Sequence, residues 1–182
     1  MVEKIEIKTA RLLLRPFKLS DLEDVLRYTS DPQWGLYLPD PRPYTREVGE
    51  EFLSRMILDN WDTNPSFAIV LDGEVIGNFH FNVDPKNKIA EVGYTIASNH
   101  WGKGLAAEVA DAVIDWGFLT YDIGKVFARG QVPNKRSWRV MEKLGMTREG
   151  LLRSHYLEHG EAKDYYVYGI LRKEWDSRKG NN

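Results

Sequence analysis

The sequence predicts a mixed α/β (α+β) fold in which a mostly antiparallel sheet of about seven strands packs with about four helices. Three observations support this fold class. The expected elements follow the order strand, two helices, three strands, helix, strand, helix and hairpin, which differs from the strict alternation of a doubly wound sheet. A chain of 182 residues has the length of about one domain. Its hydrophobic content of 42% is typical of globular proteins, so we expect residues 1–182 to form a single domain.

The composition excludes several classes of protein and of site. The chain has no cysteine, which rules out disulfides, thiolate zinc sites, iron–sulfur clusters and a cysteine acyl-enzyme. Its 25 basic residues nearly balance 27 acidic residues, so we expect no direct binding of nucleic acids or anionic membranes. The N-terminus lacks the apolar core of a signal peptide, and no run reaches the ~18 apolar residues of a membrane span. These features favour a cytoplasmic protein and are compatible with a homo-oligomer.

The N-terminal elements are predicted from local signals. Residues 11–15 form a short apolar run that ends at a proline, which indicates the first strand. Ser20 and Glu23 have the spacing of a capping box at the start of a helix. Residues 31–44 are predicted to be a loop because they contain Pro32, Pro39, Pro41 and Pro43. A second helix is expected over about 45–61.

The central elements are predicted to form antiparallel strands. Two apolar runs, 67–71 and 75–83, flank the dipeptide Asp72-Gly73, which is typical of a hairpin with a type I′ turn. Residues 89–97 alternate in polarity and form the next expected strand.

The remaining elements alternate before a final hairpin. The glycine-rich turn at residues 102–104 precedes a helix that ends near Tyr121, and 125–132 read as a strand. Asn134 opens a helix that ends at Gly145. The last expected strands are 150–157 and 162–171, and the charged C-terminus is predicted to be a solvated face, with Arg172, Lys173, Arg178 and Lys179.

The glycine turn allows three interpretations. Glycines before a helix permit a phosphate to approach unpaired backbone amides, but an ordinary turn also needs glycine. Gly102, Gly104 and Ala107 match the G-x-G-x-x-A pattern of a dinucleotide site. That site requires an acidic residue at the end of the next strand, and residues 129–132 contain none, which argues against a nicotinamide-dependent oxidoreductase. The third interpretation is an acyl-CoA turn.

Five blocks support the third interpretation: Thr9-x-Arg11-Leu12-x-Leu14-Arg15-Pro16 with Asp21, Ala90-Glu91-Val92-Gly93-Tyr94, Gly102-Lys103-Gly104-Leu105-Ala106-x-Glu108, Asn134-x-x-Ser137-x-x-Val140-Met141-Glu142-Lys143-Leu144-Gly145-Met146, and Glu149-Gly150-x-Leu152-Arg153 with Asp164 and Glu174-Trp175. In this order they resemble the GCN5-related N-acetyltransferase (GNAT) superfamily, and within it the ribosomal-protein-alanine (RimJ/RimL-type) branch. The turn departs from the family pattern at its first position, which is Asn99.

The resemblance implies a GNAT fold whose sheet splays into a V between the family's fourth and fifth strands and receives acetyl-CoA there. Backbone groups of Ile96 and Ala97 are expected to bind pantetheine, and a bulge near residues 93–95 to direct an amide at the thioester carbonyl. The pyrophosphate is expected on the amides of Trp101, Gly102, Lys103, Gly104, Leu105 and Ala106.

The resemblance also assigns candidate catalytic residues. Asn134 matches the family's pantetheine-contacting asparagine, although a plain N-cap is the alternative. Many relatives place a tyrosine seven residues later, where this chain has Met141, so Ser137 is the candidate for hydrogen bonding the CoA sulfur. An incidental helix serine is the alternative. Glu91 is the leading general base, unless it is a strand carboxylate paired with a lysine or arginine, and His80 is the alternative base.

Acetyl transfer to an amine is therefore the expected activity, by direct attack in a ternary complex. The loop aromatics Trp34, Tyr37 and Tyr44 resemble the region that lines the acceptor site in this family, while a packed loop cluster is the alternative for them. His80 is a further candidate for the acceptor site. The acceptor is expected to be a protein or peptide N-terminal amine; alternatives are a small amine (polyamine, amino-acid derivative or antibiotic) or a non-catalytic acyl-CoA-binding module. His155 and His159 flank an expected turn rather than lie on a helix, so no metal site is predicted.

Overall fold

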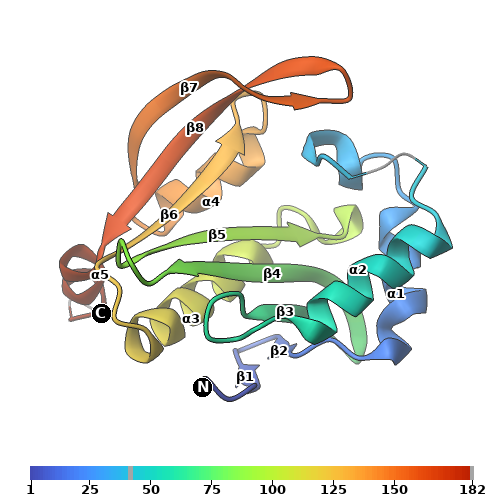
Figure 1. Cartoon of the computed structure of the whole chain (residues 1–182), viewed down its shortest axis with the longest axis horizontal. Helices are drawn as coiled ribbons and strands as arrows, with labels where there is room; N and C mark the ends of the chain where they lie inside the picture. Colours follow the sequence, from blue (N-terminus) through green and yellow to red (C-terminus); the bar gives the residue numbers. More distant parts are fainter. Residues whose placement is uncertain (41–42, 181–182) are drawn as a thin grey trace.

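One eight-stranded sheet organises the fold, and its strands lie in the order β1-β2-β3-β4-β5-β6-β8-β7 (Figure 1). The computed structural model describes residues 1–40 and 43–180; Pro41 of the predicted loop and the last two residues of the predicted domain lie outside this range. Neighbouring strands pair antiparallel except β5 and β6, which are parallel. This confirms the mixed, mostly antiparallel α/β class, with eight strands rather than about seven.

The first strand is shorter than predicted and has an unpredicted partner. β2 (Leu13–Arg15) replaces the expected strand over 11–15, and it pairs with β1 (Ile7–Lys8). The capping box predicted at Ser20 is wrong. A 3₁₀ turn, η1 (Leu19–Asp21), precedes α1 (Leu22–Thr29), and the carboxylate of Asp21 accepts from the amide of Lys18 at 2.8 Å. Asp21 also pairs with the Arg15 guanidinium at 2.8 Å, which fixes the chain here and makes the helical turn begin before Ser20.

The second helix begins as predicted and ends early. In α2 (Arg46–Leu58), the Thr45 hydroxyl caps the helix by accepting from the Val48 amide. The predicted helix reached Trp61, but this side chain is buried beyond the helix end and packs edge-on against Phe67. Burial of a large aromatic surface therefore outweighs continuation of the helix. Part of the predicted loop is a short turn, η2 (Trp34–Tyr37).

The central hairpin follows its turn signal. β3 (Ser66–Leu71) and β4 (Glu74–Asp84) flank Asp72 and Gly73, whose φ angles of 51° and 89° are those of a type I′ turn. β4 then pairs with β5 (Ile89–Ile96). That register runs without a shift from Gly77 opposite Ile96 to Asp84 opposite Ile89, so the bulge predicted near residues 93–95 is absent.

The sheet opens between β5 and β6 (Lys125–Gln131). Their parallel pairing begins at Ile89 with Lys125 and ends at Val92 with Ala128, although both strands continue. Figure 1 shows the two strands separating beyond this point. The divergence confirms the splayed sheet, and it arises because β6 leaves β5 rather than because β5 is bulged.

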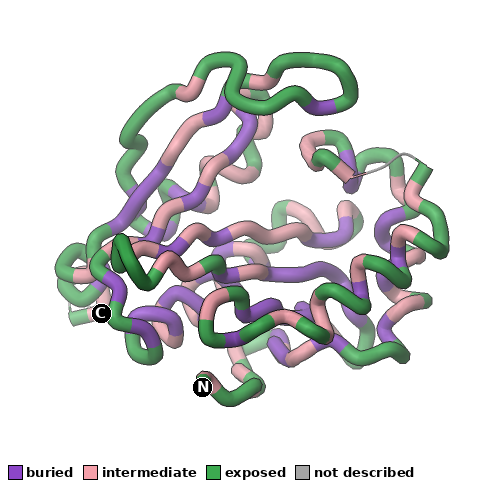
Figure 2. The backbone as a smooth tube through the Cα atoms, in the orientation of Figure 1, coloured by how far each residue is buried: buried purple, intermediate pink, exposed green. Residues whose placement is uncertain are grey.

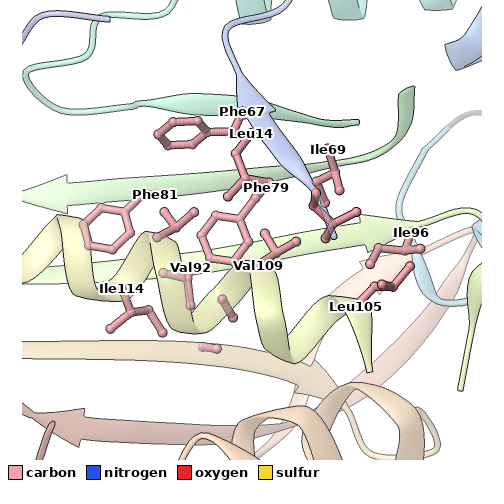
Figure 3. Packing of buried hydrophobic residues seen from close by; sticks show 14 of the residues in the cluster. Leu14, Phe67, Ile69, Phe79, Phe81, Val92, Ile96, Leu105, Val109 and Ile114 are labelled. Atoms are coloured by element: carbon pink, nitrogen blue, oxygen red, sulfur yellow. The ribbon is translucent and has the colours of Figure 1, made fainter. Parts of the chain in front are cut away.

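Helices α3 (Leu105–Thr120) and α4 (Lys135–Lys143) lie beside the open part of the sheet. Apolar residues of α3, including Val109 and Ile114, meet the sheet at Phe79 and Phe81 (Figure 3). A Cβ at Gly117 of α3 would stand 2.3 Å from the Phe81 ring, so glycine permits close packing there. Buried residues concentrate in the central strands, whereas β7 is largely exposed (Figure 2). This packing fixes the start of α3 beside the opening between β5 and β6.

The C-terminal segment contains a helix that the sequence did not predict. After β7 (Thr147–Glu158) and β8 (Glu161–Leu171), the predicted solvated face forms α5 (Arg172–Gly180). Its Trp175 is only 1% exposed, and the Trp175 indole donates to Asp115 at 2.9 Å. Trp175 is the one buried residue of this helix, so α5 lacks the apolar periodicity that identifies longer helices. Within the described ranges, no helix combines the length and apolarity required to cross a bilayer.

Candidate functional site

A cavity of about 480 Å³ lies at the opening between β5 and β6. It is formed by the end of β5, the start of α3, one side of α4, and the η2 turn. Most of the predicted site residues meet here: Trp34, Tyr37, Ile96, Trp101, Gly102, Gly104, Leu105, Ala106, Asn134 and Ser137. Residues that are 100 positions apart in sequence therefore share one cavity, as the predicted donor and acceptor sites require.

The glycine turn presents backbone amides to this cavity. Gly102 and Gly104 have φ angles of 77° and 78°, and Gly104 is the N-cap of α3. This left-handed conformation is readily adopted by glycine and rarely by other residues. The first amides of α3 have no acceptor within the helix, and the positive end of its dipole lies here. Because the cavity reaches Leu105, Ala106 and Ala107, the turn is suited to bind an anionic group.

Basic side chains add positive charge around the same turn. Arg136, Arg139 and Lys143 lie on one side of α4 and line the cavity, and no carboxylate partner is seen for them in the described part of the chain. Their sequence spacing of three, four and seven places them on one helix face, a signal that the sequence analysis missed. Lys103, whose amide is expected to bind the pyrophosphate, is not among the lining residues.

The end of β5 supplies a partly free backbone edge. The Ala97 amide donates to the Ile76 carbonyl at 2.7 Å, and the Ile96 carbonyl accepts from the Trp101 indole at 2.7 Å. These two groups are therefore engaged within the protein. Because successive backbone groups of a strand point to opposite sides, the amides of Tyr94 and Ile96 face the opening toward β6. Ala97 itself does not line the cavity.

Asn134 and Ser137 are joined at the start of α4. The Asn134 side chain accepts from the Ser137 amide at 3.2 Å, so it is the N-cap of this helix and also lines the cavity. The Ser137 carbonyl accepts from the Tyr94 hydroxyl at 3.0 Å. Burial raises the pKa of Tyr94 to about 12, so this hydroxyl stays protonated and fixes α4 to β5 at neutral pH. Met141 is 2% exposed and belongs to the core.

Glu91 lies on the opposite face of β5 from Tyr94 and is not a lining residue of the cavity. Both of its carboxylate oxygens accept from Arg129 of β6, at 2.7 and 2.6 Å. The Arg129 guanidinium also contacts Tyr156 and His155 of β7. The pairing with arginine that the sequence left open is therefore observed, and it spans the two strands where they separate.

His80 of β4 also lies away from the cavity lining. Its ring packs over Gly93, where a Cβ would stand 2.2 Å from the nearest ring atom. Burial lowers the pKa of His80, and the nearby carboxylates of Glu91 and Asp59 only partly oppose this effect. His80 is therefore a neutral imidazole beside Gly93 at pH 7. The two histidines of the last hairpin have separate contacts, Arg129 for His155 and the Leu38 carbonyl for His159.

The lowered pKa of His80 predicts a pH-dependent stability. Folding favours its neutral form, so this contribution is present above the unfolded-state pKa of about 6.5 and is lost as pH falls through the lower folded-state value. We expect His80→Gln to show a smaller drop in melting temperature between pH 7.5 and pH 5 than the parent chain. The exposed His159→Gln variant should retain the full drop. Equal drops in the parent and His80→Gln would exclude this contribution.

Comparison with known proteins identifies relatives of the whole fold. The family described as an acetyltransferase (GNAT) domain matches residues 11–147. The chain is 33% identical over 172 residues to an uncharacterized N-acetyltransferase, p20, of Bacillus licheniformis, covering 92% of this chain and 96% of that protein. It is 30% identical over 104 residues to the [ribosomal protein uS5]-alanine N-acetyltransferase of Escherichia coli K12, covering 56% of this chain and 54% of that protein.

A solved structure extends this likeness to three dimensions. The GNAT-family acetyltransferase from Bacillus anthracis superposes with a TM-score of 0.84 at 31% identity, covering 93% of this chain and all of that chain. Nearly the whole chain therefore shares its fold with an acetyltransferase of this family.

Proposed function

This chain belongs to the GNAT acetyltransferase family, in its RimJ/RimL-like branch, and we propose that it transfers an acetyl group from acetyl-CoA to the N-terminal amine of a protein or peptide. The cavity at the splay carries this proposal. It brings the left-handed glycine turn, the cations of α4 and the open edge of β5 to one place. Each of these features matches a different part of acetyl-CoA.

The cavity residues fit acetyl-CoA along its length. The amides from Trp101 to Ala106 bind the pyrophosphate at the start of α3. Arg136, Arg139 and Lys143 offset the remaining phosphate charge. The pantetheine arm lies along the edge of β5 beyond Val92, where it meets the amides of Tyr94 and Ile96. Asn134, already the cap of α4, contacts the pantetheine from the other side of the splay.

The chemistry is a direct transfer. The amine nitrogen attacks the thioester carbonyl, a C–N bond forms, and the C–S bond breaks to release CoA. An amide at the edge of β5 stabilises the oxyanion that develops on the carbonyl. The hydroxyl of Ser137 donates a hydrogen bond to the leaving sulfur. Glu91, oriented by Arg129, receives the amine proton through water, because its carboxylate lies outside the cavity lining.

The choice of acceptor rests on the acceptor side of the cavity. Trp34 and Tyr37 of η2 line it, and the Trp34 indole donates to the Thr95 hydroxyl of β5 at 3.1 Å. The likeness to the E. coli uS5-alanine enzyme favours an N-terminal amine. A small amine is the second candidate, because the imidazole of His159 at the hairpin tip contacts the carbonyl of Leu38, a residue that lines the cavity, and so ties the hairpin to this side of it.

Binding and transfer are tested separately. Calorimetric titration with acetyl-CoA should give saturable binding, whereas NADH should give none. Peptides with free N-terminal alanine or serine are then compared with N-terminally blocked peptides and with spermidine, by measuring release of free CoA. Transfer to the free peptides alone supports the proposal. Transfer to spermidine alone favours the small-amine function, and binding without any turnover indicates an acyl-CoA-binding module.

A further inference from the structure

Arg11 joins the N-terminal segment to the glycine turn. Its Nε and Nη2 atoms contact the Oε2 atom of Glu108 on α3, at 2.7 and 2.6 Å. Its Nη1 atom donates to the carbonyl of Lys103, within the turn, at 2.9 Å. The guanidinium is therefore fixed on two sides although it lies near the surface of the protein.

Glu108 is held as firmly as the arginine that it binds. Its Oε1 atom accepts from the Thr9 hydroxyl at 2.6 Å and from the Arg11 amide at 2.9 Å. Burial alone would raise the pKa of Glu108, but the hydrogen bonds from Thr9 and Arg11 hold it below the ordinary value. The carboxylate is thus a fixed anion that orients Arg11.

The guanidinium of Arg11 also lies close to the N-cap of α3. Its Nη2 atom stands 3.8 Å from the place where a Cβ of Gly104 would be, and the Lys143 Nζ atom stands 3.9 Å from the same place. Two cations, one from the N-terminal segment and one from α4, thus approach the N-cap of α3. Arginine has five N–H donors, and the contacts to Glu108 and Lys103 engage about three of them. The remaining donors are available beside Gly104.

We propose that Arg11 binds a phosphate of acetyl-CoA, and that Glu108 positions it for this purpose. The inference rests on the proposed acetyl-CoA site and extends it to the N-terminal segment, which lies outside the glycine turn and α4. A planar guanidinium with free donors suits a phosphate oxygen better than a lysine ammonium does. The separate hydrogen bond from Arg11 to the Lys103 carbonyl keeps the amides of the glycine turn in their orientation.

Two acetyl donors separate phosphate binding from a purely structural role. Acetyl-CoA carries the phosphates, whereas S-acetylpantetheine carries the same thioester without them. We expect Arg11→Ala to raise the calorimetric Kd for CoA at least about tenfold. The kcat/KM with S-acetylpantetheine should remain that of the parent chain. Arg11→Lys, which keeps a charge for Glu108, should bind CoA more tightly than Arg11→Ala and less tightly than the parent.

Controls distinguish the possible failures. Arg153→Ala removes an exposed cation of β7 and should leave both the Kd for CoA and the kcat/KM with S-acetylpantetheine unchanged. If Arg11→Ala lowered the CoA affinity and the kcat/KM with S-acetylpantetheine by the same factor, Arg11 would only support the fold. Parent-like CoA affinity in Arg11→Ala would also overturn the inference. If Arg11→Ala does not fold, Arg11→Lys carries the same comparison. Failure of the parent chain to bind CoA would instead contradict the proposed function itself.

Discussion

Replacing Gly104 with valine is expected to weaken acetyl-CoA binding about 5- to 30-fold, which corresponds to about 1–2 kcal/mol. Gly104 has a φ angle of 78°, in the left-handed region, where a β-branched residue is strained by about 1–2 kcal/mol. A new Cβ would have room, since its nearest neighbours would be Arg11 and Lys143 at 3.8 and 3.9 Å. The loss therefore comes from a turn that relaxes out of the left-handed conformation and takes its amides away from the pyrophosphate.

The control for this variant has the same backbone strain at another turn. Gly73 has a φ angle of 89°, and a Cβ there would meet no atom within 4 Å. Gly73→Val should therefore lower the melting temperature while leaving the Kd for acetyl-CoA unchanged. Calorimetry on both variants checks the prediction. Parent-like affinity in Gly104→Val would mean that this turn does not bind the pyrophosphate.

Several features that depend on a few adjacent residues were predicted well from the sequence, although the capping box at Ser20 was not. The Asp72-Gly73 turn requires two positive φ angles, which this dipeptide adopts easily, and the structure has both. The predicted start of the second helix and the glycine turn before α3 follow equally local rules. Because these signals fix local geometry, the predicted residues Gly102, Gly104 and Leu105 line the cavity.

Features that depend on distant pairs were not predicted. Glu108 and Arg11 are 97 positions apart, and no periodicity in either segment indicates their contact. Glu91 and Arg129 are 38 positions apart, on strands that become neighbours only through a parallel crossover. Pairing with a basic residue was an open alternative for Glu91, but identifying Arg129 as the partner requires knowledge of the register between β5 and β6. The helix α5 was missed for another reason: it buries one tryptophan and has no apolar stripe to indicate a helix.

The ion pair with Arg129 bears on the proposed role of Glu91 as the general base. Side-chain alternation along β5 puts Glu91 on the same face as Gly93 and Thr95, opposite the face of Tyr94, as the sequence predicts. Arg129 then holds the carboxylate at the point where the strands separate. A fixed carboxylate beside the opening is suited to receive a proton through water, and its orientation does not depend on the bound substrates.

Glu91→Gln is therefore expected to lower kcat by at least about 100-fold, the usual contribution of a general base. The amide keeps the size of the side chain and one acceptor for Arg129, so the Kd for acetyl-CoA should not change. A merely structural ion pair predicts the reverse, namely a lower melting temperature with a parent-like kcat. Full kcat across the pH range would exclude Glu91 as the base. If His80→Gln instead lost both kcat and the acidic limb of the pH–rate profile, the neutral imidazole over Gly93 would be the base, since its lowered pKa keeps it ready to accept a proton at pH 7.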